Sequence, residues 1–356
     1  MRMGVGHERN GSEVISTAEY FAYKHGLLMD IALVWFNGES VNPERGIWHW
    51  SSLDANISNA REAGFRNIWL KWTGTPAHAT VDGTITYRRY TAGPWSWSLD
   101  NRGNAVQPAA FDPSLPWVAN PTRIMQEWVR DLHSRVIERY CHNPIARGQE
   151  SSIAGLVSLN EPDDGSSFPP NAVLPLDKAW GWYFQDVLHP FRETVVPARS
   201  SLPNLAVLGP EATSTDGIRR VMDSEALDGL GSYFTHPTIH LYAGTLDEAK
   251  ETLDARMGII ERHRGGRTVG ITEGSDDQPW FWQLAEYIRD KYPDVITEWI
   301  LYAAGGRQPC FTPASYADGT YQLSAFGERV REWNEEETRN EERRRAVRNR
   351  DEEARG

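Results

Sequence analysis

Two glutamates stand where apolar, strand-like segments of the sequence end. Glu161 follows the segment at 152–160, within the stretch LVSLNEPDDG, and Glu273 ends the segment at 267–273, within VGITEGS. A carboxylate at the end of a buried strand is costly unless it is paired or keeps its proton. If the two meet, we expect one to stay neutral and the other ionised. Glycoside hydrolysis uses this division, because one carboxyl group protonates the leaving oxygen while the other attacks the anomeric carbon.

Apolar segments that resemble strands alternate with amphipathic segments along the chain. We expect strands at 1–6, 27–36, 66–72, 152–160, 204–209, 237–243, 267–273 and 295–303. We expect helices near 12–25, 51–64, 121–141, 177–195, 215–227, 247–264 and 279–291, and a last one from 322. These eight β/α units predict an α/β fold, a (β/α)8 TIM barrel in a single domain, rather than an open doubly wound sheet.

The strand ends of such a barrel converge on one opening, so Glu161 and Glu273 are expected to face each other across it. Side chains alternate between the two faces of a strand. We therefore expect Val157 and Leu159 to share the face of Glu161. By the same rule, the apolar residues two and four positions before Glu273 should share its face.

Composition narrows the possible partners and location. The 356 residues carry a net charge of −12, and 40% of them are hydrophobic, enough for a large core. A sequence pI near 5.4 argues against a nucleic acid partner, which requires a basic surface. No apolar run is long enough to span a membrane, and the first residues lack the apolar region of a secretory signal. We expect a soluble protein, cytoplasmic or secreted with its leader removed, and the sequence leaves its oligomeric state open.

Several further features bear on the organisation of the chain. Cys141 and Cys310 are too few for a disulfide framework and are expected to be free thiols. A long connection at 74–120 follows the third expected strand and is predicted to form a wall of a binding cleft. The barrel is expected to occupy residues 1–334. The charged tail at 335–356 is predicted to be a helical extension or disordered.

Short motifs near the expected strand ends carry a resemblance to a known group. These are LNEP at 159–162, ITEG at 271–274 and HLY at 240–242, together with the stretch from NPERGIWHW to TGTPAHA at 42–79. The sequence resembles the retaining glycoside hydrolases of clan A, the β-xylosidase- and cellulase-like TIM-barrel glycosidases. The resemblance spans most of the chain. It implies hydrolysis of β-glycosidic bonds in carbohydrate substrates, with no cofactor and no metal.

The resemblance also implies roles for individual residues. Glu161 would be the general acid/base and Glu273 the nucleophile, forming a glycosyl-enzyme ester. Asn160 would hydrogen-bond the 2-hydroxyl of the sugar, and Tyr242 would donate a hydrogen bond to Glu273. His240 lies two residues before Tyr242 on the same strand face, so it can either reach the substrate pocket or serve as a structural histidine.

Other candidate substrate-binding residues stand near the expected strand ends. Glu211 follows the fifth strand and is expected either to bind a sugar hydroxyl or to serve a structural role. The chain has 15 tryptophans, most of which are expected to pack in the core. Trp35, Trp72 and Trp299 are placed to stack on a sugar ring, and Trp299 resembles the aromatic floor of related sites. Trp69 lies an odd number of residues from Trp72, so it is expected to face the helices instead.

One position departs from the pattern of the group. Many of its members carry an arginine on the second strand that supports the nucleophile. The corresponding segment here, LLMDIALVWF at 27–36, has Asp30 and no arginine. The support of the nucleophile is therefore expected to come from elsewhere, unless this strand is aligned differently.

Three other functions fit the same residues. A transglycosylase would use the same ester and pass the sugar to an alcohol instead of water. A non-catalytic carbohydrate-binding barrel would use the tryptophans and the acidic opening. A metal-dependent barrel enzyme would use Glu161, Glu211 and Glu273 as ligands. Residue types do not choose between xylosides, glucans, mannans and galactosides, or between exo and endo action; the long loops and tryptophans favour an oligo- or polysaccharide cleft.

Overall fold

The structure is a computed structural model, and it describes residues 1–7, 14–80, 98–99, 105–106, 121–162, 187–223, 234–274, 278–301 and 310–353. Eight parallel strands close into a barrel in the order β1-β10-β9-β8-β7-β6-β3-β2. They are β1 (Arg2–His7), β2 (Ile31–Asn37), β3 (Asn67–Thr73), β6 (Gly155–Val157), β7 (Ala206–Pro210), β8 (His236–Leu241), β9 (Val269–Gly274) and β10 (Ile296–Leu301). The predicted (β/α)8 barrel is confirmed.

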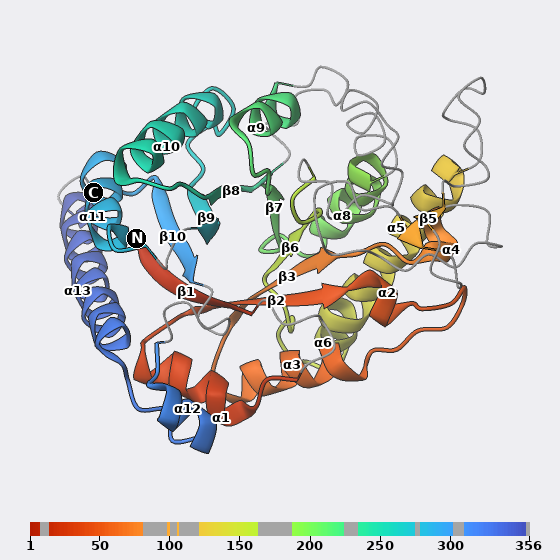
Figure 1. The fold of residues 1–356 in the computed structure, drawn as a ribbon, viewed down its shortest axis with the longest axis horizontal. Helices are drawn as coiled ribbons and strands as arrows, with labels where there is room; N and C mark the ends of the chain where they lie inside the picture. Colours follow the sequence, from red (N-terminus) through yellow and green to blue (C-terminus); the bar gives the residue numbers. More distant parts are fainter. Residues whose placement is uncertain are drawn as a thin grey trace.

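Helices surround the strands on the outside of the barrel (Figure 1). The longer ones are α3 (Ser51–Glu62), α5 (Pro121–Ile137), α8 (His189–Arg199), α9 (Thr215–Met222), α10 (Leu246–Ile260), α11 (Phe281–Lys291) and α13 (Ala325–Glu353). Shorter elements are α1 (Thr17–Phe21), η1 (Ala22–Gly26), α2 (Gly38–Val41), α4 (Ala77–Thr80), η2 (Glu138–His142), α6 (Asn143–Ala146) and α12 (Pro313–Asp318), with the antiparallel strand pair β4 (Ser98–Leu99) and β5 (Ala105–Val106). Most expected helices agree with these bounds to within a few residues, and part of the one at 177–195 lies outside the described residues.

Two expected strands are shorter in the structure than in the sequence pattern. The segment at 27–36 forms a strand only from Ile31, and the segment at 152–160 pairs only over Gly155–Val157. Most of the long connection at 74–120 lies outside the described residues, so its predicted role as a wall of the cleft stays a prediction.

The interior of the barrel is filled by inward-facing side chains of its own strands. A cluster of Ile31, Leu33, Trp69, Val157, Leu208 and Ile300 forms this inner core, separate from the larger core between strands and helices. Gly155 also faces inward, and a Cβ atom there would lie 2.6 Å from Leu208 Cδ1 and 2.9 Å from Trp69 Cδ1. The strand therefore requires glycine at this position because the inner core is already full.

This close packing predicts the cost of adding one methyl group. We expect Gly155→Ala to lower the free energy of unfolding by about 1–3 kcal/mol through overpacking of the inner core. Gly258→Ala is the matched control, because Gly258 is exposed on α10 and a Cβ atom there meets nothing within 4 Å. The control should leave stability unchanged or raise it by up to about 1 kcal/mol. Urea unfolding followed by circular dichroism measures both, and equal stability of the two variants would contradict the packing argument.

The last helix, α13, lies at the edge of the barrel beside α11 and the N-terminus (Figure 1). The amino group of Met1 forms a buried ion pair with Glu337 at 2.7 Å, and Asn334 accepts a hydrogen bond from the backbone N–H of Met3. The position proposed for the end of the barrel, residue 334, therefore falls inside a continuous helix. Among the described residues, no helix is both long and apolar enough to cross a membrane. Cys141 and Cys310 are both buried thiols rather than halves of a disulfide.

Candidate active site

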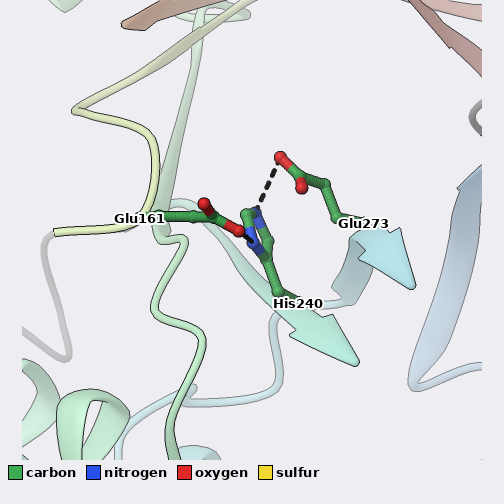
Figure 2. Close-up of side chains that lie close together, drawn as sticks. All are labelled: Glu161, His240 and Glu273. Atoms are coloured by element: carbon green, nitrogen blue, oxygen red, sulfur yellow. Dashed lines mark hydrogen bonds and ion pairs between the residues drawn. The ribbon is translucent and has the colours of Figure 1, made fainter. Parts of the chain in front are cut away.

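The two glutamates at the strand ends meet in the structure. One carboxylate oxygen of Glu161, one of Glu273 and one ring nitrogen of His240 all lie within 4.8 Å of one another. Figure 2 shows the His240 ring between the two carboxyl groups, with each glutamate pointing toward it from a different part of the barrel opening. The predicted meeting of Glu161 and Glu273 is thus observed, whereas their catalytic roles stay predictions.

The alternation of side chains along β9, which was expected to bring Glu273 to the opening, differs from the prediction. Val269 and Ile271, which were expected to share its face, pack in the outer core with the helices. The pairing of β8 with β9 is irregular, since Ile239 pairs with Ile271 but the next residue, His240, pairs with Glu273. This β-bulge leaves Thr272 as an extra residue on β9. Both Thr272 and Glu273 consequently contact the polar residues of the interior.

Glu161 is also held in an unusual backbone conformation. Its φ angle is +45°, in the left-handed region that non-glycine residues rarely adopt. Such a conformation costs on the order of 1–3 kcal/mol and persists only where the surrounding structure fixes it. The expected alternation also fails here, since Val157 faces the inner core but Leu159 packs in the outer one. The chain after β6 therefore bends, and this bend aims Glu161 at His240.

A lysine that the sequence interpretation did not single out lies at the centre of the site. Lys71, on β3, is fully buried, and its Nζ lies 2.6 Å from Glu211 Oε2 and forms an ion pair with Glu273 Oε1. Nζ also lies 3.0 Å from His240 Nε2 and 4.7 Å from the centre of the Trp35 ring. Lysine is almost never fully buried unless it is paired. Its position inside an apolar strand, two residues after Trp69, was the one signal in the sequence.

Glu211 is enclosed by protein donors and does not face a substrate. Its side chain is fully buried; Oε1 accepts hydrogen bonds from Thr238 and, at 2.7 Å, from Thr272. Oε2 contacts Lys71 and, at 2.9 Å, His240 Nε2. Both oxygens are therefore occupied. These contacts favour the structural alternative for Glu211 over the binding of a sugar hydroxyl.

His240 joins three carboxyl groups. Nδ1 lies 2.9 Å from Glu161 Oε1, while Nε2 lies 2.9 Å from Glu211 Oε2 and 3.4 Å from Glu273 Oε1. Burial lowers the pKa of His240, but Glu273 and the other carboxylates outweigh this and raise the pKa to about 9. The raised pKa favours the protonated form of the ring at neutral pH, which can donate a hydrogen bond from each nitrogen. The side chain of His240 is fully buried and contacts carboxylates through both nitrogens, which favours the structural alternative over direct contact with a substrate.

The same surroundings divide the protons between the two glutamates. Burial raises the pKa of Glu161, and the hydrogen bond from His240 offsets this only in part. Burial also acts to raise the pKa of Glu273, but His240 and Lys71 more than compensate and lower it. The positive charges beside Glu273 favour its ionised form, whereas burial favours the protonated form of Glu161. The pKa values of the two glutamates are thus shifted in opposite directions, toward the neutral acid for Glu161 and toward the carboxylate for Glu273.

Two further predicted residues lie at the opening. The hydroxyl group of Tyr242 donates a hydrogen bond to Glu273 Oε2, as predicted, and 45% of the residue is exposed. Asn160 is only 4% exposed, and its Oδ1 has no hydrogen-bond partner among the described residues. A buried amide oxygen without a partner can accept a hydrogen bond from a sugar hydroxyl. That role of Asn160 stays a prediction.

The tryptophans divide differently from the expectation. Trp35 faces inward, beside the inner core and Lys71, so its predicted stacking role stays open. Trp69 is in the inner core, whereas Trp72 faces outward and packs against Trp128 of α5 with ring centres 5.4 Å apart. Trp299 is fully buried. The expected orientations of Trp69 and Trp72 are thus reversed. Trp69 and Lys71, two residues apart, share the inward face of β3, and Trp72 lies on the opposite face.

Trp299 is likewise no floor beneath a sugar. Its ring packs against Phe281 of α11, with centres 4.7 Å apart, on the helix side of β10. The neighbouring residue Ile300 fills the inner core instead. Trp72 and Trp299 are therefore removed from the predicted substrate-binding residues, because a strand side chain that faces the helices cannot reach the opening.

The residue types at the centre of the site are also those that bind metals. Glu161, His240 and Glu273 have the spacing of a possible three-ligand group. However, Glu273 already accepts hydrogen bonds from Lys71 and Tyr242, and His240 contacts carboxylates through both nitrogens. The ammonium group of Lys71 supplies the positive charge between the acidic residues. The donor set therefore fits a hydrogen-bonded network better than a metal site.

Comparison with known proteins finds solved structures with a similar fold. No protein-family model and no curated protein matches this chain. Endo-glycoceramidase II from Rhodococcus sp. superposes with a TM-score of 0.56 at 12% identity, covering 93% of this chain and 78% of that one. A glycoside hydrolase family 30 subfamily 8 xylanase from Clostridium acetobutylicum gives a TM-score of 0.51 at 14% identity, covering 94% and 71%.

The catalytic domain of an endoglucanase from Thermobifida fusca is similar over nearly its whole length. It gives a TM-score of 0.51 at 12% identity, covering 94% of this chain and 92% of that domain. At such identities the likeness extends to the fold. Fold and site together define a (β/α)8-barrel protein in which His240 contacts two glutamates at the opening of the barrel, the buried Glu273 and the partly exposed Glu161.

Proposed function

We propose that this chain is a retaining glycoside hydrolase that cleaves β-glycosidic bonds of oligo- or polysaccharides. One observation carries the proposal: oxygens of Glu161 and Glu273 lie within 4.8 Å of each other, in surroundings that shift their pKa values in opposite directions. Carboxyl groups about 5–5.5 Å apart serve the retaining mechanism, whereas about 6.5–9.5 Å is needed to admit the water of an inverting one.

The proposed reaction is a double displacement. Glu273, ionised, attacks the anomeric carbon and forms a glycosyl ester while Glu161 donates its proton to the departing oxygen. In the second step Glu161 removes a proton from water, which attacks the same carbon and releases the sugar from Glu273. Two attacks, each with inversion, give net retention. We expect Asn160, next to Glu161, to accept a hydrogen bond from the sugar, and Trp35, which faces inward on β2, to contact the ring.

The solved structures of similar fold support the substrate class. They include a xylanase, an endo-β-1,4-glucanase from Xanthomonas axonopodis and endo-glycoceramidase II. One structure of the last protein is a lactosyl-enzyme intermediate, which is the kind of covalent species that double displacement requires. The shared fold makes the same chemistry reasonable here, and the carboxylate pair of this chain supplies the groups for it.

The proposal predicts the configuration of the first product. We expect hydrolysis of at least one aryl β-glycoside or β-linked oligosaccharide, with the β-anomer of the sugar appearing first in proton NMR and mutarotating later. First appearance of the α-anomer would contradict the retaining mechanism. Binding of oligosaccharides without any product would instead favour a carbohydrate-binding barrel, and loss of activity in EDTA would favour a metal-dependent enzyme. Sugar transfer to added methanol or to a second sugar measures the transglycosylase alternative.

A further inference from the structure

The nucleophile proposed above has a buried cation beside it that comes from an unexpected strand. The resemblance places an arginine on the second strand, where this chain has Asp30. In the structure Asp30 lies immediately before β2, where it forms ion pairs with Arg2 and Lys24. The ammonium group beside Glu273 belongs to Lys71 of β3.

We propose that Lys71, held in place by Glu211, is the positioning residue for the proposed nucleophile Glu273. This inference rests on the proposed function, because it assigns a role within the same reaction. Lys71 is fully buried, so it acts through Glu273 and does not contact substrate.

The contacts fix Glu273 from both of its oxygens. Lys71 Nζ pairs with Oε1, and the hydroxyl group of Tyr242 donates to Oε2, so the carboxylate cannot rotate freely. Lys71 is itself fixed, by Glu211 at 2.6 Å on one side and by the ring of Trp35 on the other. A reacting group held by such a rigid shell keeps the geometry of attack without reorganisation.

Glu211 has a distinct task that follows from the chemistry. When Glu273 becomes an ester it loses its negative charge, and a buried lysine paired with it alone would be left without a counter-ion. Glu211 remains ionised beside Lys71 throughout, since burial raises its pKa but Lys71 and His240 lower it well below the usual range. An uncompensated buried charge is strongly destabilising, so this permanent partner is needed for the intermediate to form.

The charge of the cluster then stays constant through the reaction. In the free enzyme the positive Lys71 and His240 balance Glu211 and Glu273, with Glu161 neutral. In the glycosyl-enzyme, Glu273 is neutral and Glu161 has given up its proton to the leaving group. One negative charge has moved from Glu273 to Glu161, next to His240 Nδ1 at 2.9 Å. The total remains zero, so no step leaves a net charge in the buried interior.

The test compares Lys71→Met with Glu211→Gln through the acid limb of the kcat/KM profile, which reports protonation of the nucleophile. Lys71 holds the pKa of Glu273 down, so Lys71→Met raises that pKa and moves the acid limb to higher pH. Glu211→Gln removes a negative neighbour, which lowers the pKa of Glu273 and moves the limb to lower pH. We also expect Lys71→Met to lower kcat/KM by about 10²–10³-fold, the usual effect of removing one electrostatic contact in an active site.

Controls separate this role from general damage to the fold. Lys24→Met removes a lysine that also pairs with a carboxylate, but at the other end of the barrel, and should leave the acid limb in place. Lys71→Arg keeps the charge, so its limb should stay near that of the wild type. An acid limb that does not move in folded Lys71→Met overturns the proposal. If that variant does not fold, the limb of Glu211→Gln decides: a shift to lower pH supports the proposal and no shift overturns it.

A second readout keeps this inference separate from the proposed function. Carbon-13 NMR of side-chain carboxyl groups follows the titration of Glu273 directly, with its signal assigned as the one missing from Glu273→Gln. If the wild-type protein hydrolyses no glycoside, the proposed function fails. The titration of Glu273 in Lys71→Met still decides whether Lys71 controls that carboxylate, and an unchanged titration overturns its positioning role.

Discussion

Glu273→Gln is expected to abolish glycoside hydrolysis while leaving the barrel folded. An amide of the same shape cannot attack the anomeric carbon or form the ester, and loss of a nucleophile costs on the order of 10⁶-fold in kcat in a well-studied hydrolase. The remaining contacts support the fold, because Lys71 keeps Glu211 as its partner at 2.6 Å. Initial rates on an activated aryl β-glycoside measure the loss, and circular dichroism confirms the fold.

Covalent trapping identifies the attacked residue independently of turnover. A 2-deoxy-2-fluoro glycoside with a good leaving group should add one sugar mass to the wild-type protein, on the peptide that contains Glu273, and none to Glu273→Gln. Glu298→Gln is the matched control, since Glu298 is another glutamate on a barrel strand, 3.0 Å from His236 and outside the cluster. It should label at the wild-type rate. A label on any carboxylate other than Glu273 would refute the assignment of the nucleophile.

The sequence predicted the barrel and the meeting of the two glutamates because both depend on long, regular patterns. Eight alternating units determine which strand ends converge, and Glu161 and Glu273 each stand at such an end. The exact start of a strand matters little for that conclusion. Which end of the barrel a residue occupies could therefore be predicted from its place along the chain.

The faces of the strands could not be predicted in the same way. A shift of one residue sends every side chain to the opposite face, so the prediction depends on the exact register. Trp72 and Trp299 were expected inside and face the helices, whereas Trp69 was expected outside and fills the interior. In β9, Val269 and Ile271 face outward, although they were expected inside. The bulge at Thr272 then turns Glu273 inward.

Lys71 was missed because its partners come from distant parts of the chain. It is stabilised by Glu211 after β7 and by Glu273 on β9, and neither of them is near it in sequence. The sequence shows only a lysine in an apolar strand. For the same reason, the sequence could indicate that Glu211 and His240 reach the opening. It could not indicate that the two side chains would form a hydrogen bond with each other.

The second large effect is expected for Glu161→Ala, and it depends on the leaving group. For substrates with poor leaving groups, loss of the general acid should lower kcat/KM by about 10²–10⁴-fold. Aryl glycosides that leave without protonation should form the glycosyl-enzyme at nearly the wild-type rate, because Glu273 is unchanged. Release of the sugar then becomes slow, since no base activates water. A burst of aryl alcohol followed by slow turnover is the expected time course.

Azide should accelerate the slow release of the sugar in Glu161→Ala and show on which face of the sugar the carboxyl group of Glu161 lies. The small anion fits the space left by the side chain and replaces a negative charge beside His240 Nδ1, which lies 2.9 Å from Glu161 in the wild type. It needs no general base, so a β-glycosyl azide should accumulate and be seen by NMR. Glu161→Gln is the control, because the amide keeps the space filled and should gain much less from azide. Equal rescue of the two variants, or an α-glycosyl azide, would contradict the role of Glu161.

The pH profile provides the last test of Glu161. Its pKa is raised by burial, and only its protonated form can act as the acid, so activity of the wild type should fall as pH rises through that pKa. In Glu161→Ala this alkaline limb should disappear for activated substrates, while the acid limb set by Glu273 stays. A wild-type limb retained in Glu161→Ala would mean that another group holds the catalytic proton. His240, with a pKa raised to about 9 and a direct contact with Glu161, would then be the group to replace next.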